Sequence, residues 1–109
     1  MIIKKPSIFI YVNKPDVSVL KEICAGIEEE GVFYEIKEME NTIPDELAWN
    51  AANDSMLGSG IGVHCTHIAL QMRGIERGHN VESYQTPNRE QSRKLGANSA
   101  RAIKKLGFK

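Results

Sequence analysis

Three consecutive glutamates, Glu28, Glu29 and Glu30, are the residues of this sequence most suggestive of binding chemistry. They stand at the predicted end of the first helix, directly before Gly31 and an apolar segment. The carboxyl end of a helix carries partial negative charge, so each carboxylate there costs roughly 0.3–1 kcal/mol, and neighbouring like charges repel. A run that breaks this rule without compensation nearby indicates that the chain binds a cation or a partner.

Helical geometry distinguishes the three glutamates from one another. The expected core side chains of this helix are Val17, Leu20, Ile23, Cys24 and Ile27. At about 100° per residue, Glu29 lies about 180° from the centre of that stripe, while Glu28 and Glu30 flank the helix. Glu29 is therefore the carboxylate best placed to reach another molecule. The alternative is that all three form a solvated charged face, and the pattern alone slightly favours this alternative.

A second group of candidate ligands, His64, Cys65 and His67, falls within one short segment. Thiolate and imidazole groups bind zinc and related metals, and these three could converge if the turn is tight. The spacing matches no zinc signature and no second cluster supplies further ligands, so we favour a hairpin turn with polar side chains. A nucleophilic Cys–His pair has less support, because no orienting group or oxyanion hole is identified.

Two other motifs have simple structural explanations. The glycines of residues 58–62 (GSGIG) lack both the Gly-Lys-Ser/Thr ending of a Walker loop and the helix that follows a dinucleotide fingerprint. Close packing of a strand against a helix explains them better, and we do not expect this chain to bind nucleotide by itself. The last predicted helix is basic, and its cations are Arg89, Arg93, Lys94, Arg101, Lys104 and Lys105. The helix dipole explains about half of them, and the others could form a docking surface for an acidic partner.

Length and composition narrow the class of protein. The 109 residues are expected to form one domain spanning 1–109, and its 14 basic and 14 acidic side chains give no reason to expect nucleic-acid binding. The apolar run from Ile8 to Val12 is too short for a signal sequence or a membrane span, so we expect a cytoplasmic protein that does not bind membranes. Two cysteines are too few for a disulfide framework, and Cys24 is expected in the core.

Hydrophobic periodicity predicts the elements that position these residues. Strands are expected at 7–12, 32–39, the last part of 57–63, 67–73 and 81–85, and helices at 16–30, 44–52 and 88–105. The first two strands and the helix between them form a right-handed βαβ unit. Only a tight hairpin fits between the third and fourth strands, so the fourth runs antiparallel to the third. Apolar residues of the fourth segment would also suit a helix, although their alternation favours a strand.

Taken in order, residues 26–31 (GIEEEG), 60–63 (GIGV) and 93–101 (RKLGANSAR) resemble the small subunits of the diol/glycerol dehydratase reactivating factors. The resemblance extends over essentially the whole chain, and the same superfamily includes the medium subunits of the coenzyme B12-dependent dehydratases. It implies a three-layer α/β/α fold like that of anticodon-binding domains. The sheet of that fold is mixed and five-stranded, in the order 2-1-3-4-5, with strand 4 antiparallel, in agreement with the strands inferred above.

The resemblance also implies a non-catalytic function. Such a small subunit pairs with a large Hsp70-like ATPase subunit in a hetero-tetramer, which binds the ATP or ADP. The complex releases damaged cobalamin from an inactivated dehydratase by exchanging subunits with the dehydratase large subunit, in the cytoplasm or in association with a bacterial microcompartment. In the family one small-subunit carboxylate binds Mg²⁺ at the interface, and Glu29 matches it, with Glu28 and Glu30 as neighbouring partner-binding residues. The Asp-x-His-x-x-Gly pattern is absent, so we expect no direct cobalamin binding.

Two other functions remain open on the sequence. One is a medium-subunit-like component of a B12-dependent dehydratase, although the chain is shorter than those subunits and has no counterpart of their N-terminal extension. The other is a small RNA-binding domain, suggested by the sheet order and the basic last helix, against which the neutral net charge weighs. The sequence does not distinguish glycerol from propane-1,2-diol as the substrate of the dehydratase that is served.

Overall fold

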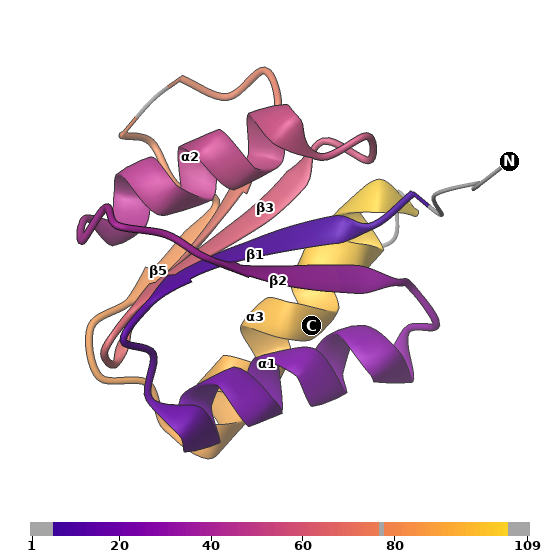
Figure 1. The fold of residues 1–109 in the computed structure, drawn as a ribbon. Helices are drawn as coiled ribbons and strands as arrows, with labels where there is room; N and C mark the ends of the chain where they lie inside the picture. The colour runs from indigo at the N-terminus through magenta and orange to yellow at the C-terminus, as the bar shows by residue number, and fades with distance from the viewer. Residues whose placement is uncertain (1–5, 77, 105–109) are drawn as a thin grey trace, which may run out of the picture.

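The computed structural model describes residues 6–76 and 78–104, which form five strands and three helices in the described part of the chain (Figure 1). The strands are β1 (Ile8–Asn13), β2 (Tyr34–Glu38), β3 (Ser59–His64), β4 (His67–Met72) and β5 (Glu82–Tyr84). The helices are α1 (Val17–Glu29), α2 (Pro44–Asp54) and α3 (Arg89–Ile103). Each predicted element is found with small shifts at its ends. The predicted end of the last helix at Lys105 lies outside the described residues.

The strands form one mixed sheet in the order β2-β1-β3-β4-β5. Strand β1 pairs in parallel with both β2 and β3, whereas β4 pairs antiparallel with β3 and with β5. Only Cys65 and Thr66 separate β3 from β4, and a connection this short can join only antiparallel strands. The predicted strand order and the antiparallel fourth strand are therefore confirmed.

Helices cover both faces of the sheet, as Figure 1 shows: α1 and α3 lie side by side on one face, and α2 lies on the other. The larger core lies beneath α1 and α3, and its fully buried side chains include Ile10, Ile23, Ile61, Leu70 and Leu95. A smaller core beneath α2 is formed by Tyr11, Leu47 and Ala51. The three-layer α/β/α architecture that the sequence predicted is thus present.

The glycines of β3 allow α2 to approach the sheet closely. Gly60 and Gly62 face α2, and a Cβ atom added at Gly60 would lie 2.1 Å from the backbone nitrogen of Ala52. One added at Gly62 would lie 2.2 Å from the carbonyl oxygen of Pro44. Real carbon atoms cannot approach backbone atoms this closely, so only glycine fits at either position. The prediction that these glycines serve strand–helix packing is confirmed.

The buried face of α1 differs from the predicted one. Val17 was expected in the core, but 80% of it is exposed, and Val19 is buried in its place. The side chain of Asp16 accepts the Val19 N–H and caps the helix, so Val17 stands in the first turn beyond the covered part of the sheet. Cys24 is buried, as predicted.

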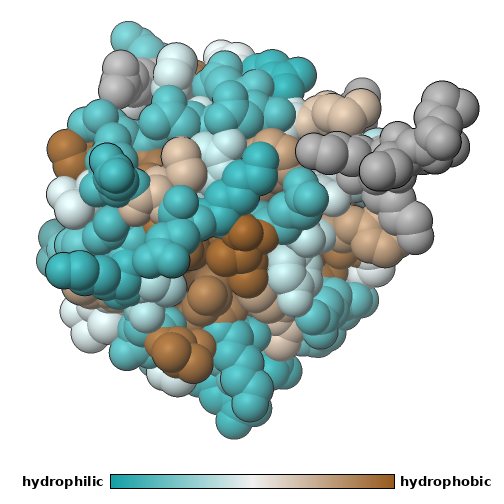
Figure 2. Space-filling model, in the orientation of Figure 1, coloured by the Kyte–Doolittle hydropathy of each residue, from teal (hydrophilic) through white to brown (hydrophobic). Residues whose placement is uncertain are grey.

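Strand β2 forms one edge of the sheet and is mostly charged and exposed. Figure 2 shows this side of the molecule, where a small apolar area lies among hydrophilic side chains. The exposed apolar residues of α1 and β2 include Val17 and Ile36. The charges of Glu35, Lys37 and Glu38 are typical of an edge strand that resists unwanted pairing. Among the described residues, no helix is long and apolar enough to cross a membrane.

Candidate functional site

The three glutamates lie at the carboxyl end of α1, where Gly31 ends the helix. Gly31 has φ 74°, a left-handed conformation that glycine adopts without strain, and its N–H donates to the Glu28 carbonyl at 3.0 Å. No basic residue of α1 itself lies in the last turn of the helix. The carboxylates therefore find their partners on other elements, and each of the three has a different one.

Glu28 lies on the outer side of this helix end and contacts β2. Its Oε1 atom accepts a hydrogen bond of 2.8 Å from the Tyr34 hydroxyl. That bond, together with partial burial, raises the pKa of Tyr34 above its usual range, because the neutral phenol is the form that donates. Glu28 remains exposed, so its carboxylate is also accessible to solvent.

Glu30 is turned towards α3. Only 11% of its side chain is exposed, and its Oε1 atom lies 3.3 Å from Nη1 of Arg101. The Lys104 ammonium group donates to the Glu30 carbonyl oxygen. Cations from a neighbouring helix therefore offset the negative charge that gathers at the end of α1. Of the three carboxylates, this one is the most enclosed.

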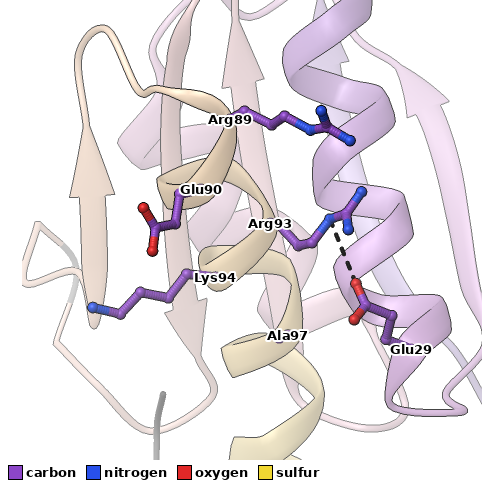
Figure 3. Close-up of a pocket in the computed structure, with 6 residues that line it drawn as sticks. All are labelled: Glu29, Arg89, Glu90, Arg93, Lys94 and Ala97. Atoms are coloured by element: carbon purple, nitrogen blue, oxygen red, sulfur yellow. Dashed lines mark ion pairs between the residues drawn. The ribbon is translucent and has the colours of Figure 1, made fainter.

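Glu29 lies between these two extremes. Its side chain is 50% exposed, and its Oε1 atom lies 3.4 Å from Nε of Arg93 on α3 (Figure 3). The helical projection placed Glu29 opposite the core side chains, and the structure adds that α3 lies beside α1, so the carboxylate meets Arg93 as well as solvent. A partly exposed ion pair of this kind contributes roughly 0.2–1 kcal/mol, so Glu29 can exchange it for another partner at low cost.

The Arg93 guanidinium joins two carboxylates of α1. Besides Glu29, it binds Glu22, whose Oε1 atom accepts a hydrogen bond of 2.7 Å from Nη2. Arg89 contacts the same Glu22 carboxylate, with 3.1 Å between Nε and Oε2. Partial burial opposes the ionised form of Glu22, but the hydrogen bond from Arg93 and the charge of Arg89 outweigh it and lower its pKa. Glu22 was not among the predicted site residues.

A groove of about 580 Å³ lies between α1 and α3 beside this network. It is lined by Glu29, Arg89, Glu90, Arg93, Lys94 and Ala97 (Figure 3). Glu29 forms the α1 side, and α3 supplies all the other residues. The groove therefore presents three cations and two carboxylates, and Glu29 is the carboxylate that α1 contributes.

The arginines of the basic last helix are largely engaged by α1. Arg93 binds Glu22 and Arg101 binds Glu30, and both pairs join residues 71 positions apart, so the two helices run parallel in a constant register. A signal for this was present in the sequence: Glu22 and Glu30 are spaced by the same eight residues as Arg93 and Arg101. The matched spacing indicates two helices that can pair along their length, in either direction, and sequence reasoning missed it.

The predicted polar turn at residues 64–67 joins β3 to β4. Cys65 is exposed and has φ 54°, and its Sγ atom lies 3.7 Å from Nε2 of His64. The other ring nitrogen of His64 lies 3.1 Å from the carbonyl oxygen of Asn13, so a strand end holds this imidazole. Nowhere in the described ranges do three His, Cys, Asp or Glu side chains gather in a way that could hold a metal ion.

Comparison with known proteins identifies the family. The family described as dehydratase medium subunit matches residues 5–109. The propanediol dehydratase-reactivating factor small subunit of Citrobacter freundii is 30% identical over 106 residues, which cover 95% of this chain and 90% of that protein.

Two solved structures share the fold of this chain. The diol dehydratase-reactivating factor complexed with ADP and Mg²⁺ contains a chain that matches with a TM-score of 0.90 at 24% identity, covering 97% of this chain and 99% of that one. A glycerol dehydratase reactivase matches with a TM-score of 0.90 at 25% identity, covering 96% and 97%. The chain therefore belongs to the dehydratase medium subunit family, and its similarity to the small subunits of the dehydratase-reactivating factors extends over nearly its whole length.

Proposed function

We propose that this chain is the non-catalytic small subunit of a factor that reactivates a B12-dependent diol or glycerol dehydratase. The observation that carries this proposal is the similarity, nearly complete along both chains, to the small subunit of a propanediol dehydratase-reactivating factor. The fold likeness to a glycerol dehydratase reactivase supports it. We expect the complex to act in the cytoplasm or in association with a bacterial microcompartment.

In this proposal the nucleotide chemistry belongs to a partner. We expect a large Hsp70-like ATPase subunit to bind ATP or ADP and to form a hetero-tetramer with this chain. The glycines of residues 58–62 support this division, because Gly60 and Gly62 lie within β3 against α2 rather than in a loop that opens a helix. A solved relative complexed with ADP and Mg²⁺ is consistent with it.

Glu29 is the residue we propose as a magnesium ligand at the interface with the large subunit. Mg²⁺ prefers oxygen ligands and is commonly held by one or two carboxylates together with phosphate or water. A half-exposed carboxylate at the rim of a groove fits this requirement, whereas Glu30 is enclosed by α3. When bound, the ion would neutralise charge between the two subunits. The remaining ligands would come from the partner, because no group of three candidate ligands occurs in the described part of this chain.

Reactivation would proceed by subunit exchange. This chain shares a family with the dehydratase medium subunits, so it can present a similar surface to the dehydratase large subunit and take the place of the medium subunit there. That exchange would open the enzyme and release damaged cobalamin. We expect no direct contact between this chain and the corrinoid.

The second candidate is a medium-subunit-like component of a dehydratase. The family description, dehydratase medium subunit, is the observation that favours it. Under this alternative the stable partner would be a dehydratase large subunit rather than an ATPase.

Co-expression separates the two candidates. The chain would be produced with the cognate large reactivase subunit or with the dehydratase large subunit, and each mixture analysed by size-exclusion chromatography with Mg²⁺ or with EDTA. We expect a stable complex with the reactivase subunit that weakens in EDTA. Glu29→Gln should weaken it in the same way while the isolated chain melts unchanged, and Glu35→Gln, an exposed change on β2, should have no effect. Co-elution with the dehydratase subunit alone would establish the second candidate instead.

A further inference from the structure

Arg93 makes two unequal contacts with the carboxylates of α1. The contact with Glu22 is a short charge-assisted hydrogen bond, 2.7 Å from Nη2 to Oε1. The contact with Glu29 is longer, 3.4 Å from Nε to Oε1, and lies outside the usual range of N–H···O hydrogen bonds. Among the described residues, no atom accepts a hydrogen bond from Nε, although Nε is buried. Arg93 therefore attracts Glu29 without holding it firmly.

Arg93 is fixed independently of Glu29. Its guanidinium is anchored by Glu22, whose side chain is only 15% exposed and which also binds Arg89. Its backbone carbonyl lies directly against Gly26, where an added Cβ would come within 2.1 Å. Glu29 can consequently turn towards solvent without disturbing the contact between α1 and α3. In such a turn the Arg93 guanidinium would keep its contact with Glu22.

From this geometry we propose that Arg93 is an internal counter-ion that competes with the interface cation for Glu29. It would thereby set the Mg²⁺ concentration at which the chain binds its large subunit. The inference rests on the proposed function, because it takes Glu29 as the interface ligand. In this proposal Arg93 acts through Glu29 alone, as a positioning residue.

Substitutions of Arg93 and of Glu22 should shift the Mg²⁺ concentration needed for association in opposite directions. Arg93→Gln removes the competitor, so Glu29 becomes available at lower Mg²⁺. Glu22→Gln removes the carboxylate that Arg89 and Arg93 share, which leaves more positive charge beside Glu29 and holds it back. The energy of a partly exposed ion pair corresponds to changes of about two- to fivefold in the Mg²⁺ concentration for half-maximal association. A loss of folding stability, by contrast, would weaken association in both variants.

The experiment measures association with the cognate large subunit by surface plasmon resonance while MgCl₂ is titrated. The chains compared are the unmodified protein, Arg93→Gln, Glu22→Gln and the control Lys21→Gln, which removes one positive charge from the exposed side of α1. We expect a half-maximal Mg²⁺ concentration about two- to fivefold lower for Arg93→Gln and higher by a similar factor for Glu22→Gln. Lys21→Gln should match the unmodified protein. Thermal melting of each isolated chain establishes that it is folded.

Glu29→Gln separates a failure of this inference from a failure of the proposed function. If association does not depend on Mg²⁺, or if Glu29→Gln leaves that dependence intact, the assignment of Glu29 as ligand is wrong. If Glu29→Gln abolishes the dependence but Arg93→Gln and Glu22→Gln cause no shift, or shifts in the same direction, only the role of Arg93 is overturned. In the double variant Glu29→Gln/Arg93→Gln, the Arg93 change should have no further effect.

Discussion

Arg93 binds Glu22 through a 2.7 Å hydrogen bond that joins α3 to α1 across 71 positions of the sequence. The same separation recurs where Arg101 meets Glu30 at the other end of the two helices. Between these pairs, Gly26 lies against the Arg93 carbonyl and Gly96 against the Ile23 carbonyl, so the helices touch through their backbones. Ion pairs at two places and close packing between them fix how α1 presents its glutamates.

Acid should weaken the α1–α3 contact through Glu22. Its pKa is lowered in the folded chain, so its contribution to stability is present above its unfolded pKa, roughly 4.3, and is lost as the pH falls through the folded value. Glu22→Gln lacks this contribution. The free energy of unfolding, measured in urea, should be lower for this variant than for the unmodified chain at pH 6. The difference between the two free energies should become smaller towards pH 3. For the control Glu35→Gln, a change on the exposed edge strand, a similar narrowing would contradict the assignment to Glu22.

Gly26→Ala should destabilise the fold despite the better helix propensity of alanine. Alanine is favoured over glycine by about 1 kcal/mol within a helix. The new Cβ would lie 2.1 Å from the Arg93 carbonyl oxygen, and a displacement of packed backbone costs roughly 1–3 kcal/mol or more. The clash should therefore prevail, with a net loss measured by chemical denaturation. Lys21→Ala, on the exposed side of the same helix, should stay within about 0.5 kcal/mol.

The tyrosines should ionise late in the folded chain. Each donates its hydroxyl to a carboxylate: Tyr11 to Asp54, Tyr34 to Glu28 and Tyr84 to Glu82. Burial and these carboxylates together raise all three pKa values, that of Tyr84 to about 12. The tyrosine pKa values in the folded chain lie above the unfolded value of about 10. The stability that these hydrogen bonds contribute is therefore present below pH 10 and is lost as the pH rises through the folded pKa values.

Absorbance at 295 nm (a wavelength at which tyrosinate absorbs) checks this prediction. The folded chain should show little ionisation near pH 10, whereas the tyrosines of the chain in urea should titrate with a midpoint near pH 10. Tyr34→Phe should remove one of the delayed ionisations and leave the other two. Titration of all three tyrosines near pH 10 in the folded chain would contradict the described hydrogen bonds.

Magnesium should have no effect on the isolated chain. In the part of the chain that the structure describes, no three candidate ligands gather, and a lone carboxylate such as Glu29 binds Mg²⁺ too weakly to stabilise the fold. The melting temperature should be the same in EDTA and in millimolar MgCl₂. Once the large subunit is added, the two conditions should differ. A clear stabilisation of the isolated chain would indicate a complete site within it.

Most of the fold could be predicted from local patterns. The alternation from His67 to Met72 favoured a strand over a helix, and the short spacing after the third strand allowed only a tight hairpin, which requires an antiparallel strand. Gly60 and Gly62 were correctly assigned to packing, since no phosphate-loop signature surrounded them. These inferences succeeded because each depends on residues close together in the chain.

The surroundings of the glutamates could not be predicted in the same way. The projection of α1 treated the sheet as the only neighbour, and so placed Val17 in the core and Glu29 opposite it. The position of α3 beside α1 is decided by contacts 71 residues apart, which no local pattern contains. The triplet lies at the end of α1, as predicted, and there each member has a different neighbour.

The ion pairs that join α1 to α3 have a mechanical consequence for any partner that binds Glu29. A pull on this carboxylate is not borne by one helix alone, since Glu22 and Glu30 tie α1 to α3 on either side of it. The load passes into both helices and from them into the sheet that they cover. A large subunit bound at Glu29 would therefore displace the whole chain together, without first unwinding the end of α1.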